Sequence, residues 1–271
     1  MLPFAVLCVF LAVQCNNPQV RSASGDDTEE ETPDPKQGRV IPRMGAHSVF
    51  EVPQCPEISG LEFSKDKDFM WAVGDGGHVA KIDFSGKCTQ HWFRDADMEG
   101  VTIDPESGDL YLSVEGVQKV CRIAAPDYNS LSDMFYVQEA VDGHFKNSGL
   151  EGIAYYKDGQ LFVGAQKKAM LWLYKTDGTL VWGKSLQDVE SSLEEVADLC
   201  YDPQTDWLWL IDSDVKAIYI FNSDATECLA KYSVSYIDNA ESLLVDREHS
   251  CVWVGSDEDN PKLYKIVFAD L

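Results

Sequence analysis

Short apolar and polar segments alternate along this chain in a pattern that recurs five times. Each repeat begins with a polar turn that leads into an apolar residue, and an aromatic residue follows about ten positions later. The apolar residues lie 40, 52, 46 and 44 positions apart: Leu61, Val101, Ile153, Leu199 and Leu243. The aromatic residues follow at an offset of ten, or nine in the third repeat: Trp71, Tyr111, Phe162, Trp209 and Trp253. A period of about 40 to 50 residues with several strands per unit is typical of a β-propeller.

The second repeat indicates how many strands one unit holds. Residues 100–104, 109–114 and 118–123 have the composition of short strands, and Pro105-Glu106-Ser107-Gly108 forms a tight turn between the first two. In other repeats a further turn leads to a fourth strand, as at residues 179–182. No segment sustains a helical period, although residues 185–196 have room for one or two helical turns. The sequence therefore predicts an all-β fold, a five-bladed β-propeller with four strands per blade.

The last repeat lacks a fourth strand of its own. The chain ends at Leu271, just after a strand-like segment at residues 262–268. A strand-like segment at residues 47–52 precedes the first repeat and has no partner there. We expect this N-terminal segment to complete the last blade, because that closes the ring and removes its open edges. The predicted propeller therefore spans residues 47–271.

The N-terminus differs in composition from the repeats. Residues 1–15, MLPFAVLCVFLAVQC, form an apolar run too short to span a bilayer and ending in Cys15, which resembles a lipoprotein signal. Residues 16–46 are rich in polar and acidic side chains and are expected to be a disordered tether. This arrangement predicts export to the cell envelope (periplasmic or outer surface, with Cys15 lipid-anchored) or secretion. The alternative is a cytosolic protein with an apolar N-terminus.

Charge restricts the partners that the chain can have. Its 46 acidic against 22 basic residues give a formal net charge of −24. Such a surface repels phosphate backbones and anionic lipids and attracts cations. We therefore expect no nucleic-acid partner, and contact with a membrane only through the lipid anchor.

Acidic residues gather where the predicted topology brings strand ends together. The first strand of a propeller blade lines the central channel and the second runs antiparallel to it. The start of the first strand and the end of the second therefore share one face. Carboxylates close to one axis repel one another unless a cation neutralises them, and an oxygen-only cluster suits Ca²⁺. The predicted metal ligands are Glu99, Glu151, Glu241, Asp75, Glu115 and Asp198. The alternative is that these acids are solvated and line a water-filled channel.

Other chemistry has little support in the sequence. Cysteines form no CxxC pair, histidines do not lie at metal-ligand spacing, and no nucleophile elbow, P-loop or dinucleotide motif occurs. We expect the cysteines of the repeats to be mostly free, buried thiols. The regular aromatic series is expected to pack one blade against the next rather than to form a binding platform.

Motifs in several repeats resemble the SdiA-regulated family, exported bacterial proteins similar to the NHL-repeat propellers. They are Ile58-Ser59-Gly60-Leu61, Val73-Gly74-Asp75, Met98-Glu99-Gly100-Val101, Ser113-Val114-Glu115, Gly149-Leu150-Glu151-Gly152-Ile153-Ala154 and Ala240-Glu241-Ser242-Leu243. The resemblance covers about residues 48–268 and implies a five-bladed propeller with a bound calcium ion. It implies no reaction. Gln166, Ala197 and Ser242 depart from the family pattern, which implies weaker binding of the ion or ligands from fewer blades.

Three functions are compatible with these features. The leading hypothesis is a calcium-binding module whose channel mouth binds an unidentified small-molecule or protein ligand. The alternative is a calcium-dependent hydrolase of the phosphoesterase or lactonase type, for which His78, three residues after Asp75, is the candidate base. The third is a structural scaffold without metal.

Overall fold

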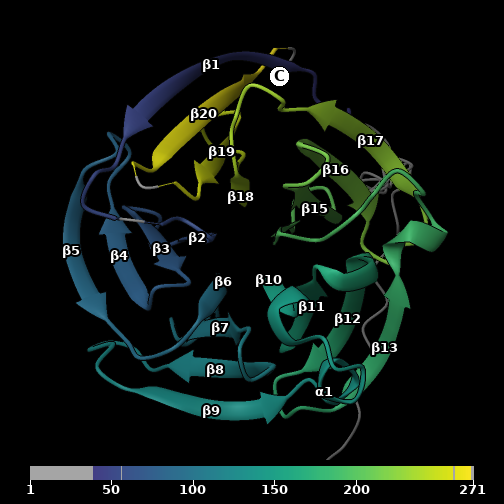
Figure 1. The fold of residues 1–271 in the computed structure, drawn as a ribbon. Coiled ribbons are helices and arrows are strands. Elements are labelled where there is room, and N and C mark those ends of the chain that lie inside the picture. Colours follow the sequence, from purple (N-terminus) through teal and green to yellow (C-terminus); the bar gives the residue numbers. More distant parts are fainter. Residues whose placement is uncertain (1–38, 56, 259, 270–271) are drawn as a thin grey trace, which may run out of the picture. The chain divides into compact units, whose positions relative to one another are not determined.

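Five four-stranded antiparallel sheets are arranged in a ring around a central axis, that of the predicted channel, in the computed structural model, which describes residues 39–55, 57–258 and 260–269 (Figure 1). In each sheet the strand nearest the channel comes first in the repeat, and the following strands lie successively outward. The predicted all-β fold, a five-bladed propeller with four strands per blade, is therefore confirmed.

The blades follow one another in chain order. Blade 1 holds β2 (Gly60–Phe63), β3 (Met70–Gly74), β4 (His78–Ile82) and β5 (Cys88–Phe93). Blade 2 holds β6 (Met98–Ile103), β7 (Leu110–Val114), β8 (Lys119–Ile123) and β9 (Leu131–Tyr136). Blade 3 holds β10 (Leu150–Tyr156), β11 (Gln160–Ala165), β12 (Met170–Lys175) and β13 (Leu180–Ser185). Blade 4 holds β14 (Asp198–Asp202), β15 (Trp207–Asp212), β16 (Ala217–Asn222) and β17 (Cys228–Ser233).

Blade 5 combines the two ends of the described chain. It holds β18 (Ala240–Asp246), β19 (Cys251–Ser256), β20 (Lys262–Phe268) and, as its outer strand, β1 (Met44–Glu51). β1 pairs antiparallel with β20, for example Val49 with Tyr264, which confirms the expected closure of the ring. The strand begins at Met44, three residues before the expected boundary at 47. The expected leader and residues 16–38 of the expected tether lie outside the described residues.

The aromatic series forms the contacts between blades. All five side chains are buried, and each belongs to a hydrophobic cluster that includes residues of the following blade. Trp209 of β15, for example, clusters with Val254 of β19, and Trp253 clusters with Leu61 of β2. Large apolar side chains at one position of every repeat thus stabilise the ring. The expectation of a packing role is confirmed.

Helical structure is confined to short connections. The helix α1 (Gln138–Asp142) and the 3-10 turn η1 (Lys146–Ser148) connect β9 to β10, which accounts for the longest repeat spacing. The turns η2 (Lys167–Ala169) and η3 (Leu186–Asp188) lie in blade 3 and after it. The sequence did not predict α1, because five residues are too few for a helical period to emerge. Among the helices in the described part of the chain, none is long and apolar enough to cross a membrane.

The six cysteines of the described residues carry free thiols. Cys55, Cys121 and Cys251 are buried, and the other three are partly buried. Burial raises the pKa of the Cys55 thiol to about 12 and that of Cys251 to about 12, which keeps both protonated and unreactive. They behave as small hydrophobic residues of the core.

Candidate metal centre

Backbone hydrogen bonds bring the start of a blade's first strand to the end of its second strand. Such bonds occur in every blade, for example from Glu115 N to Asp97 O (3.0 Å) in blade 2, from Gln166 N to Gly149 O (3.1 Å) in blade 3 and from Asp257 N to Asn239 O (2.9 Å) in blade 5. The acids at the starts of the first strands and those at the ends of the second strands therefore share one channel mouth, as the topology predicts. We call this end of the channel the acidic mouth.

Local irregularities in the inner strands change the direction in which three of the predicted ligands point. Glu99, Glu151 and Glu241 each lie where the pairing register shifts by one residue, which is a β-bulge in β6, β10 and β18. A bulged residue leaves the regular alternation of the strand, so its side chain can point away from the sheet faces. In blades 1 and 4 the equivalent residues, Ser59 and Ala197, lie just before β2 and β14 and outside the paired strands. A register shift therefore occurs at each of the three glutamates.

Two glycines, Gly60 and Gly100, allow the inner strands of neighbouring blades to approach closely. A Cβ atom on Gly100 would lie 2.6 Å from the backbone oxygen of Glu151, and one on Gly60 would lie 2.8 Å from Gly100 Cα. Neither position has room for a side chain. Close packing of the inner strands keeps the channel narrow, and the acidic side chains at its mouth are therefore close together.

Asp198 occupies the equivalent of this glycine position in blade 4, and the structure does not bring it to the other predicted ligands. Its side chain is fully buried. Its Oδ1 accepts a hydrogen bond from Leu199 N (2.8 Å), and its Oδ2 accepts one from Leu243 N in blade 5 (2.9 Å). Burial raises the pKa of Asp198 well above its usual value. Its assignment as a metal ligand stays a prediction, and these bonds indicate a role in joining two blades.

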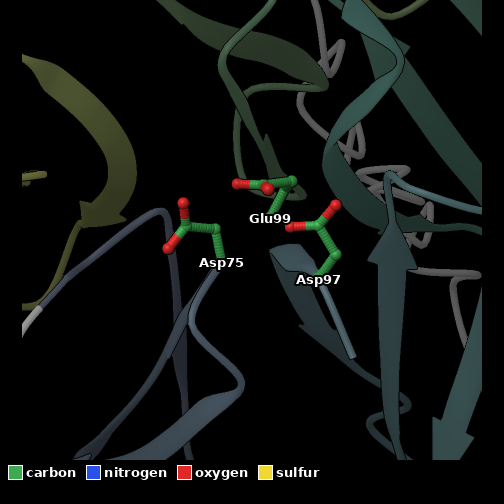
Figure 2. A group of neighbouring side chains, drawn as sticks. All are labelled: Asp75, Asp97 and Glu99. Atoms are coloured by element: carbon green, nitrogen blue, oxygen red, sulfur yellow. The ribbon is translucent and has the colours of Figure 1, made fainter. Parts of the chain in front are cut away.

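Three carboxylates converge most closely at the acidic mouth. Asp75 follows β3, Asp97 directly precedes β6 and Glu99 is the second residue of β6; one oxygen atom of each lies within 4.8 Å of the others. Figure 2 shows the three side chains facing a common space. Asp75 is exposed, Asp97 is partly buried and Glu99 is buried, so the group opens to solvent on one side. The geometry provides several oxygen donors around one point.

The other predicted glutamates interact with this group through electrostatic repulsion. Burial, followed by repulsion from Asp97 and Asp75, raises the pKa of Glu99 to about 9. Burial and repulsion from Glu99 raise the pKa of Glu151 well above its usual value. Burial, followed by repulsion from Asp257, raises the pKa of Glu241 to about 8. Five of the six predicted ligands are thus brought together: Glu99, Glu151, Glu241, Asp75 and Glu115.

Two further acids of the acidic mouth have raised proton affinities. Interaction with Asp75, followed by burial, raises the pKa of Glu57 to about 7. Burial raises the pKa of Glu115 above its usual value. A raised pKa means that positive charge stabilises the carboxylate, and either a proton or a metal ion can supply that charge.

Sequence reasoning missed some acids of this mouth, namely Asp97, Glu57 and Glu195. Each lies two residues before Glu99 or before the residue equivalent to Glu99 in its own blade, which is Ser59 in blade 1 and Ala197 in blade 4. Glu195 is buried, which raises its pKa to about 7, and its Oε1 accepts a hydrogen bond from Asp214 N (3.1 Å). The signal that identifies them is the repeat itself, because equivalent positions of a propeller share one face.

The donor set fits calcium. It consists of carboxylate oxygens, some of them buried, and Ca²⁺ binds six to eight oxygens in flexible geometry. Ser59 occupies the position equivalent to Glu99 in blade 1; it is buried, and its Oγ has no hydrogen-bond partner among the described residues. His78, the nearby nitrogen donor, bonds through Nδ1 to His91 Nε2 (2.7 Å). The available donors are therefore hard oxygens, which favour Ca²⁺ over softer metals.

Comparison with known proteins agrees with this architecture. The sequence model of the SdiA-regulated family matches residues 50–219. The chain belongs to the SdiA-regulated family. A search of curated proteins gives no significant match for this family member.

Solved structures similar to this SdiA-regulated protein are propeller-type proteins. Glutaminyl cyclase from Myxococcus xanthus is 14% identical, with a TM-score of 0.62 over 81% of this chain and 93% of the cyclase. A luciferin-regenerating enzyme is 10% identical, with a TM-score of 0.54 over 83% of this chain and 96% of that one. A chain of the nidogen–laminin complex is 12% identical, with a TM-score of 0.52 over 74% and 73% of the two chains. Identities this low show a shared fold alone, since one fold serves many functions.

Proposed function

We propose that this SdiA-regulated protein is a calcium-binding β-propeller that recognises a ligand or a protein partner at its acidic mouth. The observation that carries the proposal is the convergence of Asp75, Asp97 and Glu99. Bound calcium would supply the positive charge that allows these carboxylates to ionise together and would leave coordination positions for an oxygen of the ligand. The small-molecule or protein ligand is unidentified.

The chain's own residues favour binding of a cation at this mouth. Glu99 is buried among other acids, so ionisation without a cation is costly there. Asp75 and Asp97 lie nearer to solvent and complete an opening through which an ion can enter and leave. Glu151 and Glu241, which repel Glu99, would add negative potential around the ion without needing to touch it.

Glu99→Gln is expected to weaken calcium binding by roughly tenfold or more, because it removes one ligand charge with almost no change of shape. Isothermal titration calorimetry with calcium chloride measures the affinity. The matched control is Glu106→Gln, which removes the same charge from the exposed turn after β6, at the far end of the blade. Equal affinities of the two variants would contradict the assignment of the site.

A binding module is favoured over the hydrolase. The candidate base His78 stacks on His91, with ring centroids 4.9 Å apart, and is hydrogen-bonded to it. We expect no hydrolysis of phosphoester or lactone test substrates by the calcium-loaded protein. Calcium-dependent turnover that Glu151→Gln abolishes would instead favour the hydrolase.

Export and anchoring extend this proposal to the cell envelope. The motivation is the apolar leader that ends in Cys15, followed by a polar segment. We expect the full-length protein to fractionate with membranes and the Cys15→Ser variant to be released from them. Equal fractionation of the two proteins would contradict lipid anchoring at this residue.

A further inference from the structure

Two adjoining cavities lie at the opposite end of the channel, where the inner strands of the blades end. Their volumes are 260 and 190 Å³, and both are lined by Glu62, Ile103, Pro105, Tyr201 and Pro203. Because every inner strand runs from the acidic mouth to this end, the cavities are separated from the candidate calcium site by the length of those strands. Each is far larger than the space that one water molecule occupies. We call this end the tyrosine mouth.

Aromatic and apolar side chains form most of the larger cavity. Tyr155 and Tyr156 reach it from the end of β10, and Tyr201 reaches it from β14. Tyr156 packs edge-on against Tyr201, with ring centroids 4.8 Å apart, and the Tyr201 hydroxyl donates to Asp206 (2.8 Å). Such contacts fix the rings in place. A rigid wall of this kind suits a flat or apolar ligand.

A single carboxylate, that of Glu62, is held among these apolar residues. Its Oε1 accepts a hydrogen bond from Phe63 N (2.7 Å), and its Oε2 accepts one from Thr102 Oγ1 (2.9 Å). Thr102 in turn accepts a hydrogen bond from Tyr155 N (2.8 Å), so the carboxylate is fixed by a chain of bonds across three blades. Burial raises the pKa of Glu62 to about 7. A fixed carboxylate in such surroundings favours a ligand that brings a positive charge or hydrogen-bond donors.

The basic residues that line the two cavities already have partners. Lys157, the basic residue of the larger cavity, pairs with Asp206 (2.7 Å) and lies 5.2 Å from the Tyr156 ring centroid. In the smaller cavity Arg247 pairs with Asp202 (2.7 Å), Lys65 donates to the backbone oxygen of Glu106 (2.5 Å), and Lys67 lies 5.4 Å from the Phe63 ring centroid and interacts with Glu62 through its charge. Among the residues that line the larger cavity, Glu62 is the charged group that forms no ion pair with another lining residue. A positively charged group is therefore expected to bind in the larger cavity, beside Glu62.

We propose that the tyrosine mouth is a second ligand site, which binds a small amine carrying an apolar or aromatic body. The ammonium group bonds to Glu62 and faces the tyrosine rings, whose π-electrons attract cations. The apolar body contacts Ile103, Pro105 and Pro203. This site does not depend on calcium at the acidic mouth, so the two assignments stand or fall separately.

Three probes of nearly equal shape test the ligand class: 2-phenylethylamine, 2-phenylethanol and 3-phenylpropionate. At about pH 8, where Glu62 is mostly ionised, the amine is expected to bind saturably with a dissociation constant on the order of a millimolar, as its size allows. The alcohol and the carboxylate are expected to bind at least roughly tenfold more weakly. Tighter binding of the carboxylate, equal binding of the alcohol or no saturable binding of the amine would overturn the proposal. Ligand-observed NMR measures all three.

Matched variants separate specific binding from attraction to an acidic protein. Glu62→Gln alters the carboxylate at the tyrosine mouth, and Glu194→Gln alters an exposed carboxylate before β14, at the opposite end of the blades. We expect Glu62→Gln to weaken amine binding by roughly tenfold or more and Glu194→Gln to leave it within about twofold. The reverse ranking would assign the amine to the acidic mouth and overturn the proposal, as would equal binding by Glu62→Gln and the parent protein.

A measurement on the parent protein guards against a variant that fails to fold. The methyl groups of Ile103 and Thr102 lie at the tyrosine mouth, whereas Ile211 is buried in the core between blades 4 and 5. The amine is expected to shift the methyl resonances of Ile103 and Thr102 in NMR spectra and to leave those of Ile211 unchanged. Saturable shifts that spare Ile103 and Thr102 would overturn the proposal.

Discussion

Calcium at about a hundred times its dissociation constant is expected to raise the melting temperature of this protein by roughly 5–10 °C relative to excess chelator. The carboxylates are clustered only in the folded state, so binding of calcium to the cluster stabilises that state by RT ln(1 + [L]/Kd), or about 2.7 kcal/mol. For a domain of this size each kcal/mol shifts the melting temperature by about 2–4 °C. Magnesium is expected to do less, because it requires stricter octahedral geometry.

The calcium effect is expected to grow as the pH rises. Glu99 and Glu241 have pKa values of about 9 and about 8 in the folded protein, against 4.5 as the ordinary value. Between these limits the folded state binds more protons than the unfolded state. The contribution of these two groups to the stability of the calcium-free protein is therefore greatest below about pH 4.5, and it falls as the pH rises towards 9. Calcium replaces the protons and removes much of this loss.

Differential scanning calorimetry at about pH 6 and pH 9, with chelator or with calcium, measures both effects. The control is Glu99→Gln, which has no proton to lose at this position and is expected to show a weaker calcium shift and a weaker pH dependence. Identical melting temperatures with chelator and with calcium at pH 9 would contradict the proposed metal site.

Removing the N-terminal strand is expected to destabilise the propeller by roughly 3 kcal/mol or more. Deleting residues 1–53 removes β1 from blade 5, together with the buried Val52 and with Phe50, which packs against Trp253. Full burial of one such apolar side chain contributes about 1.5–3 kcal/mol. The loss corresponds to a melting temperature lower by roughly 10 °C. It also exposes the edge of β20, which favours aggregation.

Deleting only residues 1–38 is the matched control, because it leaves every described residue in place. We expect this shorter deletion to melt like the parent protein and to elute as the same species in size-exclusion chromatography. The longer deletion is expected to melt earlier and to elute as aggregate. Similar behaviour of the two truncations would show that β1 does not hold the ring closed.

The acidic mouth could be predicted in part from the sequence. The repeat places Glu99, Glu151 and Glu241 at equivalent positions, and equivalent positions of a ring converge on its axis. Asp198 does not share this position, because it lies one residue before Leu199 just as Gly100 lies one residue before Val101. In the structure both of its carboxylate oxygens accept backbone hydrogen bonds. A shift of one residue along a strand turns a side chain to the other face, which separates Asp198 from the glutamates.

The sequence by itself determined the repeat, the strand order and the closure of the last blade. These depend on features that are local in the chain, namely alternating segments, turn residues and aromatic side chains at a nearly fixed offset. The tertiary structure alone decided that, among the acids of the mouth, Asp75 and Glu99 converge most closely and that Asp97 joins them, because that contact depends on bulges and on the close packing of neighbouring inner strands. The tertiary structure alone also revealed the tyrosine mouth. Glu62 and Tyr201 are ordinary alternating residues in the sequence, and they line one cavity only because closure of the ring brings the ends of their strands together.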